Sequence, residues 1–139
     1  GVVGAFLNGN LLFSDRRSRV FETSGETATL FAGFSAAEWP DEVAASSVPA
    51  VDVTGMTLAP NGDLYFVAGP TWTIHSLASD GILRRVAGNG DLQIDTPAPD
   101  GSLARDSSLE WPLDVAFDQD GRLLFTEWRA NVVRAIDAA

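Results

Sequence analysis

Cysteine and lysine are both absent from the sequence, and histidine occurs once, as His75. The absence of cysteine excludes a disulfide framework and a thiolate metal site, and it leaves the compartment open, with an extracellular or periplasmic location compatible. A single histidine excludes a metal centre built from several histidines of this chain. No apolar run approaches the roughly 20 residues that a transmembrane helix needs, so we predict no membrane insertion.

Basic residues are few, because nine arginines stand against 19 acidic residues and the formal net charge is −10. Such a negative field disfavours nucleic acid and anionic lipid surfaces as partners. The same charge keeps a β-rich protein in solution. The 139 residues suit one domain, and a hydrophobic fraction of 45% is typical of a folded chain.

Three short segments repeat one pattern, an Asn-Gly or Asp-Gly pair followed directly by an apolar run. They are Asn8–Phe13, Asn61–Phe66 and Asp120–Phe125. This pattern is the strongest local indication of a tight hairpin, and we expect positive φ at both central residues of each turn. An apolar strand precedes each turn, and a third strand follows a polar stretch. In the first two units a second turn leads to a fourth strand, which the third unit lacks.

The long connections between the units also repeat. Residues 41–49 and 100–112 each run from an aspartate through small and apolar residues to a Ser-Ser pair and a proline. The glycines of successive turns are 53 and 59 residues apart, and four short strands at such a spacing are typical of β-propeller blades. We therefore predict an all-β fold, a partial β-propeller of about three four-stranded antiparallel blades with the last blade incomplete.

The whole chain, residues 1–139, is predicted to form a single propeller segment. Its blade units span approximately residues 1–33, 51–88 and 112–139, joined by inserts at 34–50 and 89–111.

The chain resembles the NHL-repeat β-propellers. The likeness rests on Val115–Phe125, the Ser79–Gly81 turn, the Val86–Gly90 exit and the Asp100-Gly101 insert. Leu109–Pro112, which reads Leu-Glu-Trp-Pro, is also similar to the NHL propeller of teneurin and YD-repeat proteins.

The usual polar Asn-His-Arg stretch before the third strand is only partly matched, by Ser18–Val20 and Asn131–Arg134, and the second unit lacks it. The resemblance transfers no catalytic residue. It implies a repeat protein that serves as a binding scaffold, since such propellers host binding modules more often than enzymes.

The connection between the second and third strands of each unit carries the candidate binding residues. In a propeller these connections lie on the same face as the inserts. Arginine and aromatic side chains gathered on one face are typical of binding hot spots, although a charged solvated loop and a tryptophan between blades are the alternatives. The candidates are Arg16, Arg17, Trp72, Trp128, Arg129 and Asn131. Trp39 and Trp111, which precede prolines in the inserts, are interpreted as packing residues.

Other chemistry-bearing residues are interpreted structurally. His75 is flanked by apolar strand residues, so we expect a strand histidine with a hydrogen-bonded ring and no catalytic triad. The aspartates of residues 91–106 have spacings that match no calcium loop, and we expect a solvated connection. We predict no catalytic residue, no metal site and no cofactor.

Two functions from different classes remain open. The first is a non-catalytic module that binds a protein or small ligand on the insert-bearing face. The alternative is part of a propeller hydrolase or lyase, similar to lactonases, with a metal on the central axis. For that alternative, Asp52 and Asp114 are the acids expected at matched positions where the first strands begin.

Ring closure gives a further expectation about partners. Propellers close with roughly four to eight blades, and exposed strand edges promote association. We expect either that the chain is a fragment of a larger propeller, whose remaining blades complete the ring, or that a second copy does so.

Overall fold

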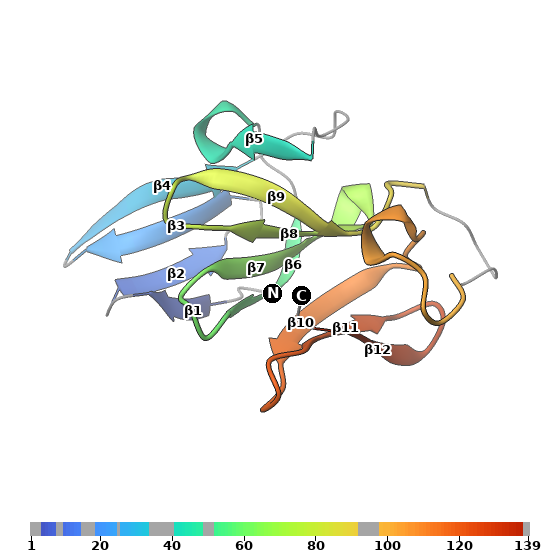
Figure 1. Cartoon of the computed structure of the whole chain (residues 1–139). Helices are drawn as coiled ribbons and strands as arrows, with labels where there is room; N and C mark the ends of the chain where they lie inside the picture. The colour runs from blue at the N-terminus through green and yellow to red at the C-terminus, as the bar shows by residue number, and fades with distance from the viewer. Residues whose placement is uncertain are drawn as a thin grey trace.

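The computed structural model describes residues 4–7, 10–14, 19–24, 26–33, 41–48, 52–91 and 98–137. These residues form three antiparallel sheets arranged side by side, with the second sheet between the other two (Figure 1). The described part of the chain contains strands and short 3-10 turns but no α-helix, and therefore no helix able to cross a membrane. The fold is all-β, as predicted: a partial β-propeller with an incomplete third blade.

The strands follow the chain within each sheet. The first sheet contains β1 (Gly4–Leu7), β2 (Asn10–Ser14), β3 (Arg19–Ser24) and β4 (Thr27–Gly33). The second contains β6 (Val53–Leu58), β7 (Leu64–Ala68), β8 (Thr73–Leu77) and β9 (Ile82–Ala87), with β5 (Glu42–Ala44) beside β9. The third contains β10 (Pro112–Phe117), β11 (Leu123–Glu127) and β12 (Val132–Ile136). The 3-10 turns are η1 (Ala45–Ser47), η2 (Gly69–Thr71) and η3 (Ala104–Asp106).

The hairpin turns differ from the expected geometry. In the β6–β7 turn, the N–H of Gly62 donates to the carbonyl of Ala59 at 2.9 Å, so Pro60 and Asn61 are the central residues. Only Gly62 has a positive φ, of 91°. The expectation of positive φ at both residues of the Asn-Gly pair is therefore wrong here. Proline supplies the negative φ that the first central position needs, and glycine alone takes the left-handed conformation that returns the chain to the strand.

The second sheet is buried on both faces. Along β7, Leu64 and Phe66 face the first sheet and join a cluster with Leu12, whereas Val67 faces the third sheet. On that side Val67 packs with Phe125. Each such side chain contributes about 1.5–3 kcal/mol when fully buried, so the sheets are held together mainly by apolar contact.

The insert between the first two blade units adds a strand that was not predicted. Strand β5 pairs antiparallel with β9, which gives the second sheet five strands. Two ion pairs strengthen this edge, Arg84 with Glu42 at 3.3 Å and Arg85 with Asp41. The outer edge of the second blade is thereby covered.

The first strands of the three sheets lie next to one another. Strand β6 contacts both β1 and β10, and the backbone of Gly55 on β6 approaches Leu113 and Asp114 on β10 very closely. Both β6 and β10 carry an irregularity in the same place, between Val53 and Met56 and between Pro112 and Val115. The two strands are therefore structural copies.

Candidate functional site

The predicted binding residues fall into two groups. Arg16 and Arg17 lie outside the described residues. Trp72 follows η2 in the β7–β8 connection, and Trp128, Arg129 and Asn131 form the β11–β12 connection.

Three tryptophans are stacked on this loop face. The ring centroids of Trp72 and Trp111 are 5.5 Å apart with an interplanar angle of 15°. The centroids of Trp111 and Trp128 are 4.9 Å apart at 11°. We call these three side chains the tryptophan stack. It joins the second blade, which supplies Trp72, to the third blade.

Trp111 is the member that the sequence interpretation missed as part of the site. Trp111 packs between blades, as predicted, and it also belongs to the candidate site, because its ring stacks on both Trp72 and Trp128. Its indole Nε1 is buried and has no hydrogen-bond partner in the described part of the chain. The sequence places Trp111 directly before the first strand of the third unit, and that position was the available signal.

The backbone holds the stack in place. The N–H of Trp128 donates to the carbonyl of Trp111 at 3.0 Å, and the N–H of Arg129 donates to the carbonyl of Glu110 at 3.4 Å. Trp72, Trp111 and Asn131 all have left-handed backbones, with φ of 52°, 55° and 54°. A left-handed backbone raises the conformational free energy of residues other than glycine, and such residues are found more often at functional sites.

Exposure rises along the stack. Trp72 and Trp111 are half-buried, whereas Trp128 is 56% exposed. Arg129, which follows it, is also exposed. An exposed indole next to a guanidinium is suited to aromatic, cationic or hydrogen-bonding partners.

A buried acid lies beneath the β11–β12 connection. The carboxylate of Glu127 is fully buried, and its Oε1 accepts the backbone N–H of Glu110 at 2.6 Å. Its Oε2 lies 3.7 Å from Nη1 of Arg134. This acid ties the start of β10 to the end of β11.

A cavity of about 530 Å³ opens beside this connection. It is lined by both charged and apolar side chains, among them Asp100, Glu110, Arg129, Val132 and Arg134. Arg129, one of the predicted binding residues, thus lines a cavity that none of the three tryptophans lines.

His75 lies in the interior of the second sheet and is 1% exposed. Its Nε2 is 2.9 Å from Oγ1 of Thr73, and its ring stacks on Phe66. The expectation of a strand histidine with a hydrogen-bonded ring is confirmed. Burial lowers the pKa of His75 from 6.5 to about 3, with a smaller contribution from the nearby Arg85 cation.

We expect the buried imidazole of His75 to make the free energy of unfolding depend on pH. Between pH 6.5 and 3 the unfolded chain binds a proton at His75 that the folded chain does not, so stability falls as the pH drops. At about pH 4.5 the loss relative to pH 7 is about 3 kcal/mol. The His75→Phe variant is the matched control, because Phe21 stands at the corresponding register of the first sheet. Urea unfolding at the two pH values measures both proteins, and parallel pH dependences would contradict the expectation.

Asp52 and Asp114, the acids predicted for a metal on the central axis, do not occupy matched positions in their strands. The shared irregularity aligns Gly55 with Asp114, and Asp52 with Trp111. The expected match of Asp52 and Asp114 is therefore wrong. It took the segments that begin at the prolines of positions 49 and 112 as equivalent, whereas the strands keep the 59-residue spacing of the turn glycines. Among the residues that the structure describes, no group of three His, Asp or Glu side chains lies close enough to hold a metal.

No protein-family model and no curated protein matches the sequence. Solved structures do match. A protein of unknown function from Bacteroides thetaiotaomicron has a TM-score of 0.73 and 21% identity over 92% of this chain and 32% of its own. An auxiliary nutrient binding protein from the same organism has a TM-score of 0.67 and 15% identity, covering 92% and 34%.

Lyases of the same fold also match. A virginiamycin B lyase from Staphylococcus aureus, solved with quinupristin, has a TM-score of 0.55 and 17% identity over 96% of this chain and 39% of its own. The chain thus spans about a third of the length of the structures it matches. At these identities the likeness establishes the β-propeller fold alone.

Proposed function

We propose that this chain is a non-catalytic binding module, part of a propeller of the NHL type, that holds a protein or small ligand on its insert-bearing loop face. The observation that supports this most directly is the exposed indole of Trp128 at the outer end of the tryptophan stack. Trp and Arg side chains contribute a large share of binding energy in interfaces.

The stack also preorganises the site. Stacking on Trp111 restricts the outer indole, and the backbone N–H of Trp128, which donates to the carbonyl of Trp111, fixes the connection that carries it, so a ligand has less to order. Preorganisation of this kind increases affinity because less conformational freedom is lost on binding. The cavity beside Arg129 provides a polar contact next to the apolar one.

The Trp128→Ala variant is expected to bind at least about tenfold more weakly than the wild type, as for a hot-spot residue. Ligands are first selected on peptide, glycan and small-molecule arrays, and dissociation constants are then measured by calorimetry. Trp128→Phe keeps an aromatic face and should lose less. Gln119→Ala is the control, because Gln119 is exposed in the β10–β11 turn, at the opposite end of the third sheet from the β11–β12 connection.

Two results would contradict the proposal. One is unchanged binding by a folded Trp128→Ala protein, or the absence of any array ligand. The other is turnover of quinupristin or of a lactone by the purified chain, which would favour the hydrolase or lyase alternative.

A further inference from the structure

A chain of hydroxyl groups links the buried His75 to the connection that carries Trp72. Nε2 of His75 lies 2.9 Å from Oγ1 of Thr73, and this oxygen lies 2.6 Å from Oγ1 of Thr71. The Thr71 hydroxyl in turn donates to the carbonyl of Ala68 at 3.2 Å. Thr73 and His75 are 4% and 1% exposed, so bulk water does not compete for the bond between them. A continuous hydrogen-bonded chain therefore runs from the interior of the second sheet to η2.

The carbonyl at the end of this chain fixes the direction of its hydrogen bonds. A carbonyl oxygen only accepts and a hydroxyl has one proton, so the proton of Thr71 is used on Ala68. Thr71 must then accept from Thr73, and Thr73 must accept from Nε2 of His75. Burial keeps the imidazole neutral at pH 7, since its pKa is about 3. The chain is complete only when the single ring proton of His75 is on Nε2.

Trp72 lies between the two threonines of this chain. It ends η2 with a left-handed backbone, and its N–H donates to the carbonyl of Gly69 at 3.2 Å. This backbone raises the conformational free energy of a tryptophan, so the surrounding bonds have to hold it. Because the hydroxyls of Thr71 and Thr73 are bonded to each other, the residues on both sides of Trp72 are held together. The chain thus restrains the backbone that directs the indole toward Trp111.

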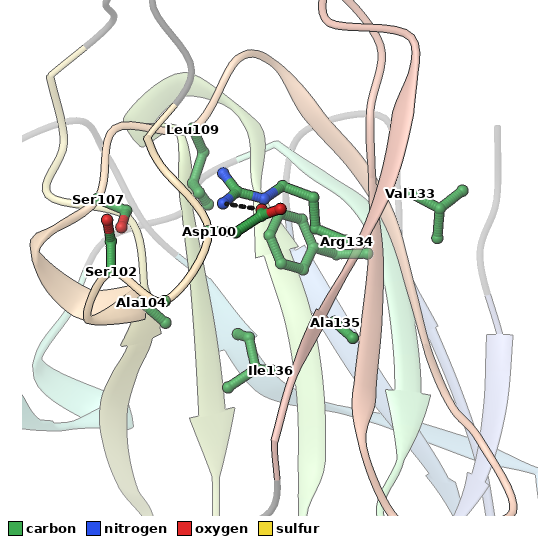
Figure 2. Close-up of a pocket in the computed structure, with 11 residues that line it drawn as sticks. Asp100, Ser102, Ala104, Ser107, Leu109, Val133, Arg134, Ala135 and Ile136 are labelled. Atoms are coloured by element: carbon green, nitrogen blue, oxygen red, sulfur yellow. Dashed lines mark hydrogen bonds and ion pairs between the residues drawn. The ribbon is translucent and has the colours of Figure 1, made fainter.

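The equivalent connection of the third sheet has no hydroxyl groups at these positions. The residues that correspond to Thr71, Thr73 and His75 are Ala130, Val132 and Arg134. Asn131 stands at the position of Trp72 and takes the same left-handed backbone. Arg134 reaches instead to the insert, where it donates to the carbonyl of Ala98 at 2.9 Å and to the Asp100 carboxylate at 3.4 Å (Figure 2). The turn itself therefore does not need the chain, which accompanies the tryptophan.

Packing does not require a histidine at position 75 either. Phe21 stands at the same register of the first sheet, where it stacks on Phe13 with ring centroids 5.4 Å apart and an interplanar angle of 20°. His75 stacks on Phe66 in the same way, at 5.9 Å and 26°. An apolar ring thus fills this place in a neighbouring blade. What the imidazole adds is the nitrogen that bonds to Thr73.

We propose that His75, as the Nε2–H tautomer, is a positioning residue for the tryptophan stack and acts on Trp72 through Thr73 and Thr71. Hydrogen bonds in such a water-excluded chain strengthen one another. Loss of any member should therefore release η2 and change how the indole of Trp72 stacks on Trp111. The inference rests on the proposed function, because it takes the tryptophan stack as the binding surface.

The tautomer can be measured directly, because the protein has one histidine and its ring signals are unambiguous. Long-range ¹H–¹⁵N correlation spectra of the ¹⁵N-labelled protein at pH 7 distinguish a protonated from an unprotonated ring nitrogen. We expect a protonated Nε2 and an unprotonated Nδ1. The Nδ1–H tautomer would reverse the chain and overturn the proposal, and this measurement needs no variant.

The Thr73→Val variant tests the effect on the stack. Valine keeps the β-branched shape, removes the middle hydroxyl and is the residue at the equivalent position of the third sheet. We expect it to lose the contribution of Trp72 to the near-ultraviolet circular dichroism, measured as the difference between the wild type and Trp72→Phe. Thr73→Ser keeps a hydroxyl and should retain this signal. Thr57→Val is the control, because it removes a hydroxyl from β6 at the end of the second sheet away from η2.

A double-mutant cycle separates positioning from general destabilisation. In the Trp72→Phe background, Thr73→Val should change the spectrum no further, because the Trp111–Trp128 pair does not depend on the chain. The proposal is overturned if a folded Thr73→Val protein keeps the wild-type spectrum. It is also overturned if the substitution changes the spectrum equally in both backgrounds.

If Thr73→Val does not fold, the pair His75→Phe and His75→Gln takes its place. Phenylalanine has no donor and should lose the Trp72 signal, whereas the glutamine amide N–H should retain it. Equal signals in the two proteins would overturn the proposal. None of these measurements uses a ligand, so failure of the proposed binding function leaves them unchanged, and a result against His75 leaves the Trp128→Ala binding test standing.

Discussion

Replacing Glu127 by alanine is expected to destabilise the protein by about 3–5 kcal/mol, the usual cost of removing one member of a buried ion pair. The Glu127 carboxylate is fully buried, and its loss leaves the N–H of Glu110 without its acceptor at 2.6 Å. It also removes the acid that lies 3.7 Å from Arg134. Urea unfolding at pH 7 measures the change.

Two variants serve as controls for this result. Glu127→Gln keeps an oxygen that accepts the Glu110 N–H and should lose less stability. Glu42→Ala removes an exposed glutamate that pairs with Arg84 at 3.3 Å, and surface pairs are worth at most about 1 kcal/mol. If Glu127→Ala and Glu42→Ala lose the same free energy of unfolding, burial does not make the Glu127 carboxylate more important than an exposed one.

Replacing Gly55 by alanine should separate the second and third blades and cost about 3 kcal/mol or more, at the upper end of overpacking effects. A Cβ at this position would lie 2.5 Å from Cα of Asp114 and 2.7 Å from the carbonyl oxygen of Leu113. Both obstacles are backbone atoms of β10, so the strands themselves must move. Because the tryptophan stack joins the same two blades, its near-ultraviolet circular dichroism should weaken as well.

Gly62→Ala is the matched control. Gly62 has a φ of 91°, but a methyl group added to it would meet no atom within 4 Å, so alanine there costs only the conformational penalty of about 1 kcal/mol. Its tryptophan signal should be unchanged. If Gly55→Ala behaves like Gly62→Ala, the close approach of β6 and β10 does not constrain the fold.

Much of the fold could be predicted because its determinants are local. A turn glycine and the apolar run after it lie within a few residues of each other, and three copies of that pattern indicated the hairpins and the propeller. Strand β5 escaped prediction because it is three residues long and gains its partner, β9, from a segment about 40 residues away.

The candidate site was predictable only in part, because its residues also meet from distant segments of the chain. Trp72 and Trp128 were indicated by their equivalent connections, but neither connection shows that Trp111 lies between them. The predicted match of Asp52 with Asp114 is wrong for another reason: both strands carry the same irregularity in the same place, so Asp52 corresponds to Trp111. This correspondence could be read from the sequence, because the turn glycines Gly62 and Gly121 are 59 residues apart.

By itself the sequence determined the repeated hairpins, the all-β class and the acidic surface, since these follow from turn chemistry, side-chain alternation and charge. Only the tertiary structure decided which side chains meet across blades and which are buried: the tryptophan stack, and the burial of His75 and Glu127. The physical reason is that these contacts join residues far apart in the chain, and their geometry depends on how whole sheets pack.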